Sequence, residues 1–322
     1  MRLHSSACSG DRRSGFVLGE MGDMTKVKMS CSPVSSGARW RLPVLRGSAA
    51  PLVVLVGLGL AGCESAGSLA TVGMGIAEVT PRSKDSSVNL ASLSDVVARN
   101  PQDPEAYNTR GAAYARTGDF DKAVVDFTKA VQIDPNNAAA YTNRALAYRQ
   151  TGRNDLALAD FNRALESNRN HAPAYLGRGN LLRAQGNLEQ AMSDLDQAIK
   201  LNSEGAQGAQ AFHARGLIHQ RRGEQAAAIT DFDNAIDRDP FAAAPYQARA
   251  QSYTAQGKYA QAIEDYNAAL NVDSKNGEAW AGLGLAYEKS GNMTKAKESY
   301  SRAKVVDPGN RVATDGMSRV GA

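Results

Sequence analysis

The chain has 322 residues, of which 43% are hydrophobic and 6% aromatic, and its formal net charge is +4. Residues 1–62 hold eight Lys and Arg against three acids, whereas the rest holds 29 basic and 30 acidic residues and is nearly neutral. A nucleic-acid-binding protein carries positive charge on its folded part, so this distribution excludes nucleic acid as a partner. Three Cys cannot form a disulfide framework. No metal site is expected, because His213 and His219 lack the i, i+4 spacing of helical metal ligands.

An apolar run at residues 49–60 is too short to span a bilayer, which needs about 20 residues, and has the length of a signal-peptide core. Arginines precede it, and two small residues and a cysteine end it. This order resembles the lipobox of bacterial lipoproteins, here Leu60, Ala61, Gly62 and Cys63. The resemblance implies cleavage before Cys63 and a covalent diacylglyceryl and acyl lipid on its sulfur and amino group. The alternative is a buried apolar segment that happens to end in cysteine.

The segments around this run are assigned from their composition. Residues 29–62 are the predicted signal peptide, with Met29 as a start that gives a leader of ordinary length. Residues 1–28 are then a start-site artefact or a disordered extension. Residues 63–103 are rich in Ser and Gly at first and predict a flexible tether followed by a short lead-in helix. Glu64 follows the predicted lipidation site. In enterobacterial lipoproteins an Asp at this place often retains the protein in the inner membrane. Because the residue here is Glu, the outer membrane is favoured.

From residue 104 the sequence repeats every 34 residues. Position 15 is Gly and positions 20 and 27 are Ala in all six repeats, while positions 4 and 24 carry large, mostly aromatic residues. A glycine turn between two segments with small residues on one face predicts a pair of closely packed helices in each repeat. The repeats are 104–137, 138–171, 172–205, 209–242, 243–276 and 277–310, with three residues inserted before the fourth.

This pattern resembles the tetratricopeptide repeat. The resemblance implies an all-α fold: a right-handed α-solenoid of six helix hairpins with a concave groove. Residues 311–322 are expected to form a short C-terminal capping helix. Position 32, often Pro in this family, is Pro in repeats one, four and six and another residue in the other three.

Two charged positions recur together. Position 7 is Arg and position 23 is Asp in repeats one to five, and repeat six has Leu283 and Ser299 instead. Both positions lie eight residues from the turn, so we predict five ion pairs within repeats. The alternative is an arginine ladder that binds phosphate or peptide, but the joint loss in repeat six favours the structural role. The predicted pairs are Arg110 with Asp126, Arg144 with Asp160, Arg178 with Asp194, Arg215 with Asp231, and Arg249 with Asp265.

The resemblance also places positions 2, 5, 9 and 12 of the first helix of each repeat on the concave surface. Their amides, small apolar groups and few arginines suit an extended or helical peptide, although a merely solvated helix face is equally compatible. The lysines of a carboxylate clamp are missing, and Asn143 alone fits such a clamp. The candidate groove contacts are Asn108, Thr142, Asn143, Leu146, Arg149, Asn180, Arg183, His213, Gln220, Gln247 and Gln251.

The sequence therefore predicts a non-enzymatic, lipid-anchored scaffold or adaptor. It would face the periplasm, bind peptide segments of cell-envelope proteins, and need no cofactor besides its lipid. A pilotin-like assembly factor for a secretin or pilus system is the alternative, and the chain could form a homodimer. An enzyme is disfavoured, because only twelve residues follow the last repeat and no catalytic constellation is present.

Overall fold

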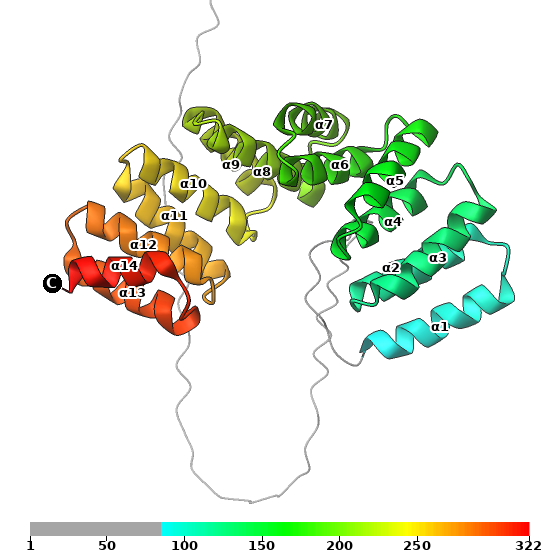
Figure 1. Ribbon diagram of the computed structural model, residues 1–322, viewed down its shortest axis with the longest axis horizontal. Coiled ribbons are helices and arrows are strands. Elements are labelled where there is room, and N and C mark those ends of the chain that lie inside the picture. The colour runs from blue at the N-terminus through cyan, green and yellow to red at the C-terminus, as the bar shows by residue number, and fades with distance from the viewer. Residues whose placement is uncertain (1–84, 322) are drawn as a thin grey trace, which may run out of the picture. The chain divides into compact units, whose positions relative to one another are not determined.

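The computed structural model describes residues 85–321, and all regular structure in this range is α-helical (Figure 1). The predictions for residues 1–84, including the signal peptide and Cys63, fall outside the described residues. Helix α1 (Asp85–Arg99) occupies the expected lead-in position, and α14 (Arg311–Val320) is the expected C-terminal cap. Between them each repeat forms one helix hairpin, whose two helices are called A and B below.

The A helices start at the first residue of each repeat except the fourth. They are α2 (Pro104–Arg116), α4 (Ala138–Gln150), α6 (Ala172–Ala184), α8 (Gly205–Arg221), α10 (Ala243–Ala255) and α12 (Gly277–Lys289). The B helices are α3 (Phe120–Ile133), α5 (Asn154–Ser167), α7 (Leu188–Leu201), α9 (Gln225–Arg238), α11 (Tyr259–Val272) and α13 (Met293–Val306). The three inserted residues, together with Gly205 before them, extend the start of α8, which has 17 residues where the other A helices have 13.

Glycine at position 15 makes the turn inside every hairpin. Its φ angle lies between +73° and +87° in all six repeats, a conformation that costs any other L-residue strain. Polar side chains cap several helix starts. Before α2, the side chain of Asp103 accepts a hydrogen bond from the backbone N–H of Glu105, and Pro104 is the first helical residue. These local signals fix where each helix begins and ends.

The core is built from large residues of B helices set against small residues of A helices. Phe127, Phe161, Phe232 and Tyr300 are fully buried at position 24. A Cβ on Gly111 would lie 2.7 Å from the ring of Phe127, so the close approach of the two helices requires a small residue there.

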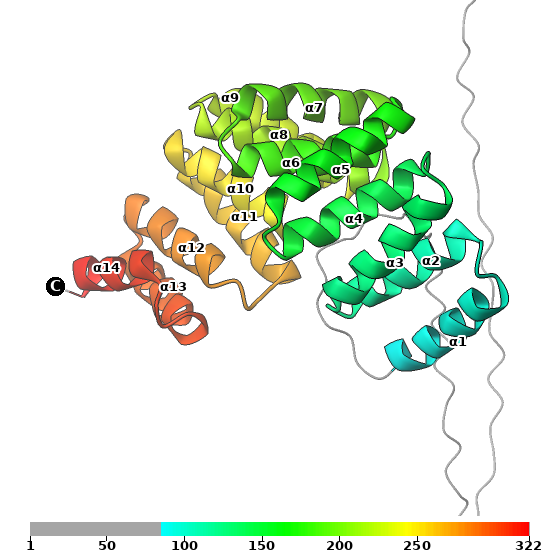
Figure 2. The same cartoon turned by 45° about the vertical axis from the view of Figure 1, so that its right-hand side comes forward.

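Neighbouring hairpins stack in chain order (Figures 1 and 2). Each A helix contacts the A helix of the next repeat, whereas B helices of the described chain do not contact each other. The A helices are therefore closer together, which places them on the inner, concave side of the α-solenoid. This arrangement puts positions 9 and 12 of successive repeats on one continuous surface.

All five predicted Arg–Asp pairs are present, and each is bidentate. The arginine Nε and Nη2 donate to the two carboxylate oxygens of the aspartate over 2.7 to 2.9 Å. The aspartates are buried and the arginines are partly buried. In repeat six, Leu283 joins a hydrophobic cluster and Ser299 donates to the carbonyl of Lys295.

The same arginines also join neighbouring repeats. The remaining nitrogen, Nη1, donates to position 25 of the preceding repeat. The four bonds are Arg144 to Thr128 at 3.2 Å, Arg178 to Asn162 at 2.7 Å, Arg215 to Asp196 at 2.7 Å, and Arg249 to Asp233 at 2.5 Å. Position 25 is polar in all six repeats, and this signal was available in the sequence but was not recognised.

Substitution of one pair tests whether it stabilises the stack. Arg144→Leu leaves the buried Asp160 carboxylate unpaired and should lower the free energy of unfolding by about 3 kcal/mol. The double variant Arg144→Leu/Asp160→Ser, which copies repeat six, should recover most of this loss. Urea unfolding followed by circular dichroism measures both.

A matched control is Arg163→Leu, because Arg163 pairs with Glu166 at an exposed site of α5. It should change stability by less than about 1 kcal/mol. The prediction would be contradicted if Arg144→Leu and Arg144→Leu/Asp160→Ser lost the same free energy of unfolding. Asp160 would then not depend on Arg144 for its stability in the buried site.

Candidate functional site

The inner surface of the A helices is the candidate site, and three predicted contacts do not reach it. Asn108, Thr142 and Asn143 are buried. Asn143 Nδ2 donates to Asn108 Oδ1 over 2.9 Å between α4 and α2, and Thr142 Oγ1 donates to the carbonyl of Ala138 over 2.8 Å. Their assignment as groove contacts was wrong, because this part of the A helices packs against the neighbouring A helix.

Two further candidates connect neighbouring repeats. Gln220 Nε2 on α8 donates to the carbonyl of Ala248 and to Ser252 Oγ on α10, over 3.0 and 3.1 Å. Gln247 donates to Glu278 over 3.2 Å and accepts from Asn276 over 2.6 Å, next to the start of α12. These amides hold adjacent A helices together, so a ligand would have to compete with bonds inside the protein.

The remaining candidates lie at the surface. Gln251 is exposed, and the others are partly exposed. Most of them occupy positions 9 and 12, whereas the buried or bridging ones are mainly at positions 5 and 6. The accessible set is Leu146, Arg149, Asn180, Arg183, His213 and Gln251.

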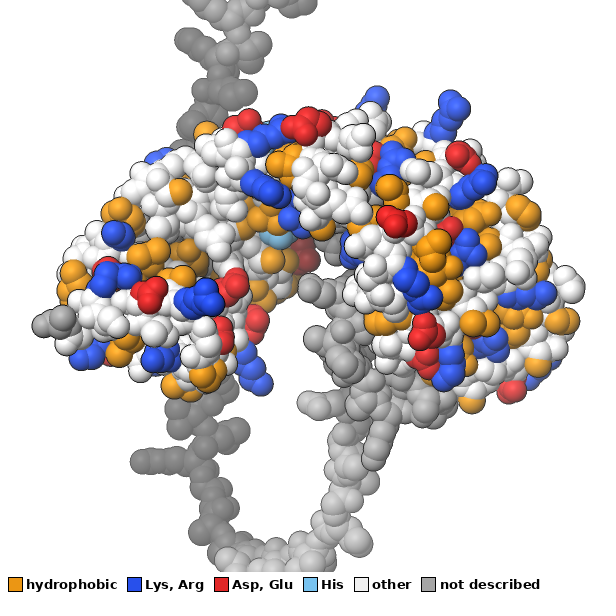
Figure 3. All heavy atoms as spheres, viewed as in Figure 1, with side chains coloured by type: hydrophobic (Ala, Val, Ile, Leu, Met, Phe, Trp, Pro, Cys, Tyr) orange, Lys and Arg blue, Asp and Glu red, His pale blue; other side chains and the backbone are white. Residues whose placement is uncertain are grey.

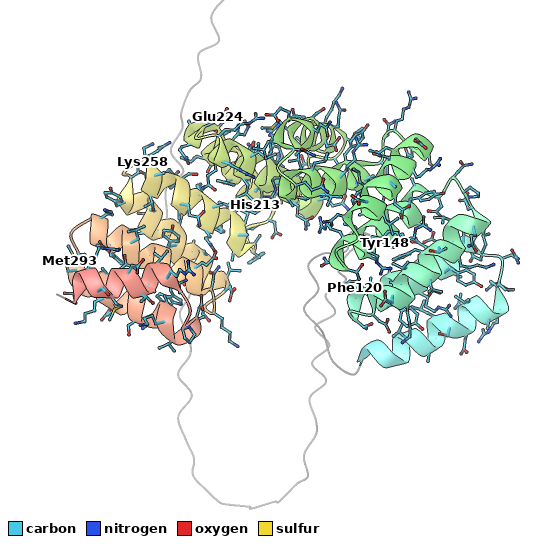
Figure 4. All side chains as sticks on the ribbon, in the orientation of Figure 1. Phe120, Tyr148, His213, Glu224, Lys258 and Met293 are labelled. Carbon is cyan, nitrogen blue, oxygen red and sulfur yellow. The ribbon has the colours of Figure 1, made fainter. Side chains whose placement is uncertain are left out.

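Arg183 and His213 lie close enough on this surface for the charge of the arginine to act on the imidazole. Arg183 comes from α6 and His213 from the next A helix, α8, where Figure 4 labels it. Burial, and to a lesser degree the charge of Arg183, lowers the pKa of His213 to about 4, so its imidazole is neutral at pH 7. The imidazole packs against Phe232, with ring centroids 5.8 Å apart.

Arg183 is less well satisfied than the paired arginines of the repeats. Its Nε is buried and has no hydrogen-bond partner within the described structure. Burial and the charge of Arg221 lower its pKa. By contrast, the bonds that Arg178 donates to Asp194 raise the pKa of that guanidinium, although burial opposes them. This nitrogen is too deeply buried for a partner to reach, so a partner's carboxylate would have to bind the outer part of the guanidinium.

Other kinds of site find little support between residues 85 and 321. No group of three or more His, Cys, Asp or Glu in this range could hold a metal ion. None of its helices combines the length and apolarity needed to cross a membrane. Basic and acidic side chains alternate over the visible face (Figure 3), as the near-neutral composition of this part predicts.

Comparison with known families identifies the repeats. Models described as tetratricopeptide repeat match residues 104–137, 142–206, 176–243 and 277–310, and a model described as TPR repeat matches residues 250–291. Together they cover more than half of the chain. A search of curated proteins found no match.

Solved structures share the fold. A chain of the Cut9–Hcn1 hetero-tetramer of the APC/C matches 72% of this chain with a TM-score of 0.65 and 20% identity. The match spans 46% of that chain, which is less than half of its length. PilF from Pseudomonas aeruginosa matches with a TM-score of 0.62 and 20% identity, covering 69% of this chain and 99% of PilF. PilW, a type IV pilus biogenesis factor, matches with a TM-score of 0.60 and 18% identity, covering 66% of this chain and 97% of PilW.

At these identities the structural likeness concerns the fold alone. The family models match the sequence itself, and the matches to residues 104–137 and 277–310 begin at the first residues of α2 and α12. Repeats of this kind are generally protein-interaction modules rather than catalytic ones. The chain belongs to the tetratricopeptide-repeat family.

Proposed function

We propose that this protein is a non-enzymatic adaptor that binds peptide segments of cell-envelope proteins along its A helices and is anchored by lipid on Cys63. The observation that carries the binding half is Arg183, a partly exposed arginine of the inner surface that makes no ion pair with any residue between 85 and 321. A guanidinium that no acid of its own chain neutralises can bind a carboxylate of a partner.

A polypeptide segment suits this surface better than a small metabolite. Along the same inner surface lie the amides of Asn180 and Gln251, the apolar side chain of Leu146 and, next to Arg183, the neutral ring of His213. An extended or helical segment could pair an acidic side chain or its terminal carboxylate with Arg183 and lay other side chains over the remaining positions.

The anchoring half of the proposal rests on the sequence before the solenoid. An apolar run, small residues and Cys63 occur in the order of a lipobox, and 21 residues separate Cys63 from the start of α1. Fully extended, they would span at most about 75 Å. A diacylglyceryl unit with an added acyl chain exceeds the single chain that binds membranes marginally. Glu64 favours the outer membrane, with the solenoid facing the periplasm.

A pilotin-like assembly factor is the second candidate function. PilF and PilW match this chain over 99% and 97% of their own lengths, and PilW is described as a type IV pilus biogenesis factor. The identities of 20% and 18% support a common fold, and carrying the role over to this chain is a hypothesis. Capture of a secretin or pilin subunit as the main partner would favour it over a general adaptor.

Crosslinked capture from envelope fractions tests the binding surface. Arg183→Ala removes the unpaired donor and should reduce the recovery of specific envelope partners about tenfold, the equivalent of about 1.4 kcal/mol. Arg163→Ala, an exposed arginine on α5, is the matched control and should bind like the wild type. Circular dichroism verifies that both variants are folded.

The other outcomes of this capture are also informative. Recovery of cytosolic proteins alone would overturn the envelope assignment, and equal recovery by both variants would remove Arg183 from the site. Self-association would appear as recovery of untagged copies of the chain itself.

Metabolic labelling with palmitate tests the anchor. Cys63→Ser should abolish labelling and release the protein from membranes, because the lipid is attached through the Cys63 sulfur. Cys31→Ser, which lies in the predicted leader, should label like the wild type. Continued labelling of Cys63→Ser would disprove the lipoprotein assignment.

A further inference from the structure

The third repeat lacks an aromatic ring that repeats one, two and five place beside the position 7 arginine. In repeats one, two and five the position 11 tyrosine lies over the guanidinium, with the ring centroid 5.8 to 6.0 Å from its carbon. In repeat four the position is His219, whose Nε2 lies 3.8 Å from Asp231 Oδ2. In repeat three the residue is Leu182, and the Arg178 guanidinium has Tyr175 as its ring contact.

A hollow of about 400 Å³ opens at this place. Its lining comes from α5, α6 and α7 and includes Arg178, Leu182, Leu158 and Asp194. Leu182 and Asp194 are buried, Leu158 and Arg178 are partly buried, and the remaining lining residues are exposed and polar. The exposed lining residues are Asn162, Gln190 and Ser193.

These surroundings match the needs of an aromatic ring. Leu158 and Leu182 offer apolar contact, and Arg178 offers a guanidinium held in place by two bonds to Asp194 and one to Asn162. A guanidinium fixed in this way stacks on a ring without losing further side-chain freedom. Ser193 and Gln190 at the rim could bond a phenol hydroxyl, so tyrosine fits better than phenylalanine.

We propose that this hollow receives an aromatic side chain, preferably tyrosine, from a partner protein. The intruding ring would take the place that the chain's own position 11 tyrosine occupies in repeats one, two and five. At about 100° per residue, positions 7 and 11 lie on a different face of α6 from positions 9 and 12. The hollow is therefore a second contact point, separate from the surface around Arg183. An experiment can disprove binding at one of the two without disproving binding at the other.

Titration with a small probe tests the proposal on the full chain. N-acetyl-tyrosine amide should show saturation transfer from the protein in NMR spectra, and N-acetyl-leucine amide should show at least fivefold less. Leu182→Tyr fills the hollow from within and should weaken tyrosine-probe binding at least tenfold. Ser193→Trp, which changes an exposed rim residue and leaves the core intact, should do the same.

A gain-of-site variant is the complementary test. Tyr148→Leu removes the corresponding ring of repeat two, which Figure 4 labels, and should create a second hollow and double the bound probe. Equal binding of the tyrosine and leucine probes to the wild type would overturn the proposal. So would unchanged tyrosine-probe binding in both folded variants, Leu182→Tyr and Ser193→Trp.

Discussion

A helix hairpin of 34 residues cannot bury its own apolar face, and the architecture of this protein follows from that constraint. Each hairpin covers the next, with position 24 rings set against alanines and glycines of the A helices. The position 7 arginine is the polar counterpart of this stacking. It binds the aspartate of its own hairpin through two nitrogens and the preceding hairpin through the third. In repeats two to five one arginine thus links the two helices of its own repeat to each other and to the repeat before it.

The sequence was most informative where repeats agree. The turn glycine, the alanines and the paired loss of Arg and Asp in repeat six were enough to predict the hairpins and all five ion pairs. The bond to position 25 was missed, because a polar residue on a B helix also suits an exposed face. Thr128 and Asn162 differ chemically, yet each serves as the acceptor for the next arginine.

The residues exposed in the groove were harder to predict than the hairpins. The sequence of one repeat does not show how closely its A helix packs against the A helix of the next repeat. Asn108 and Thr142 at position 5 are buried where A helices meet, and His213 at the same position in the fourth repeat is partly exposed. Most residues at positions 9 and 12 lie beyond this contact, as Asn180 and Arg183 do, although Gln220 at position 12 bonds to α10. Both proposed contact points involve the third repeat, where Arg183 makes no ion pair with any residue between 85 and 321 and Leu182 replaces the tyrosine of repeats one, two and five. A fold shared with many proteins cannot supply such information.

The central functional claim is that a partner protein lies against the inner surface of the A helices. Site-specific photo-crosslinking in living cells tests it most directly, with a benzophenone amino acid placed at one exposed position at a time. Gln251 lies on the inner surface at position 9 of α10, and Asn267 is exposed on the B helix α11 of the same repeat. The account predicts protein adducts from position 251 and none from position 267. Adducts from position 267 alone, or from both positions equally, would contradict it.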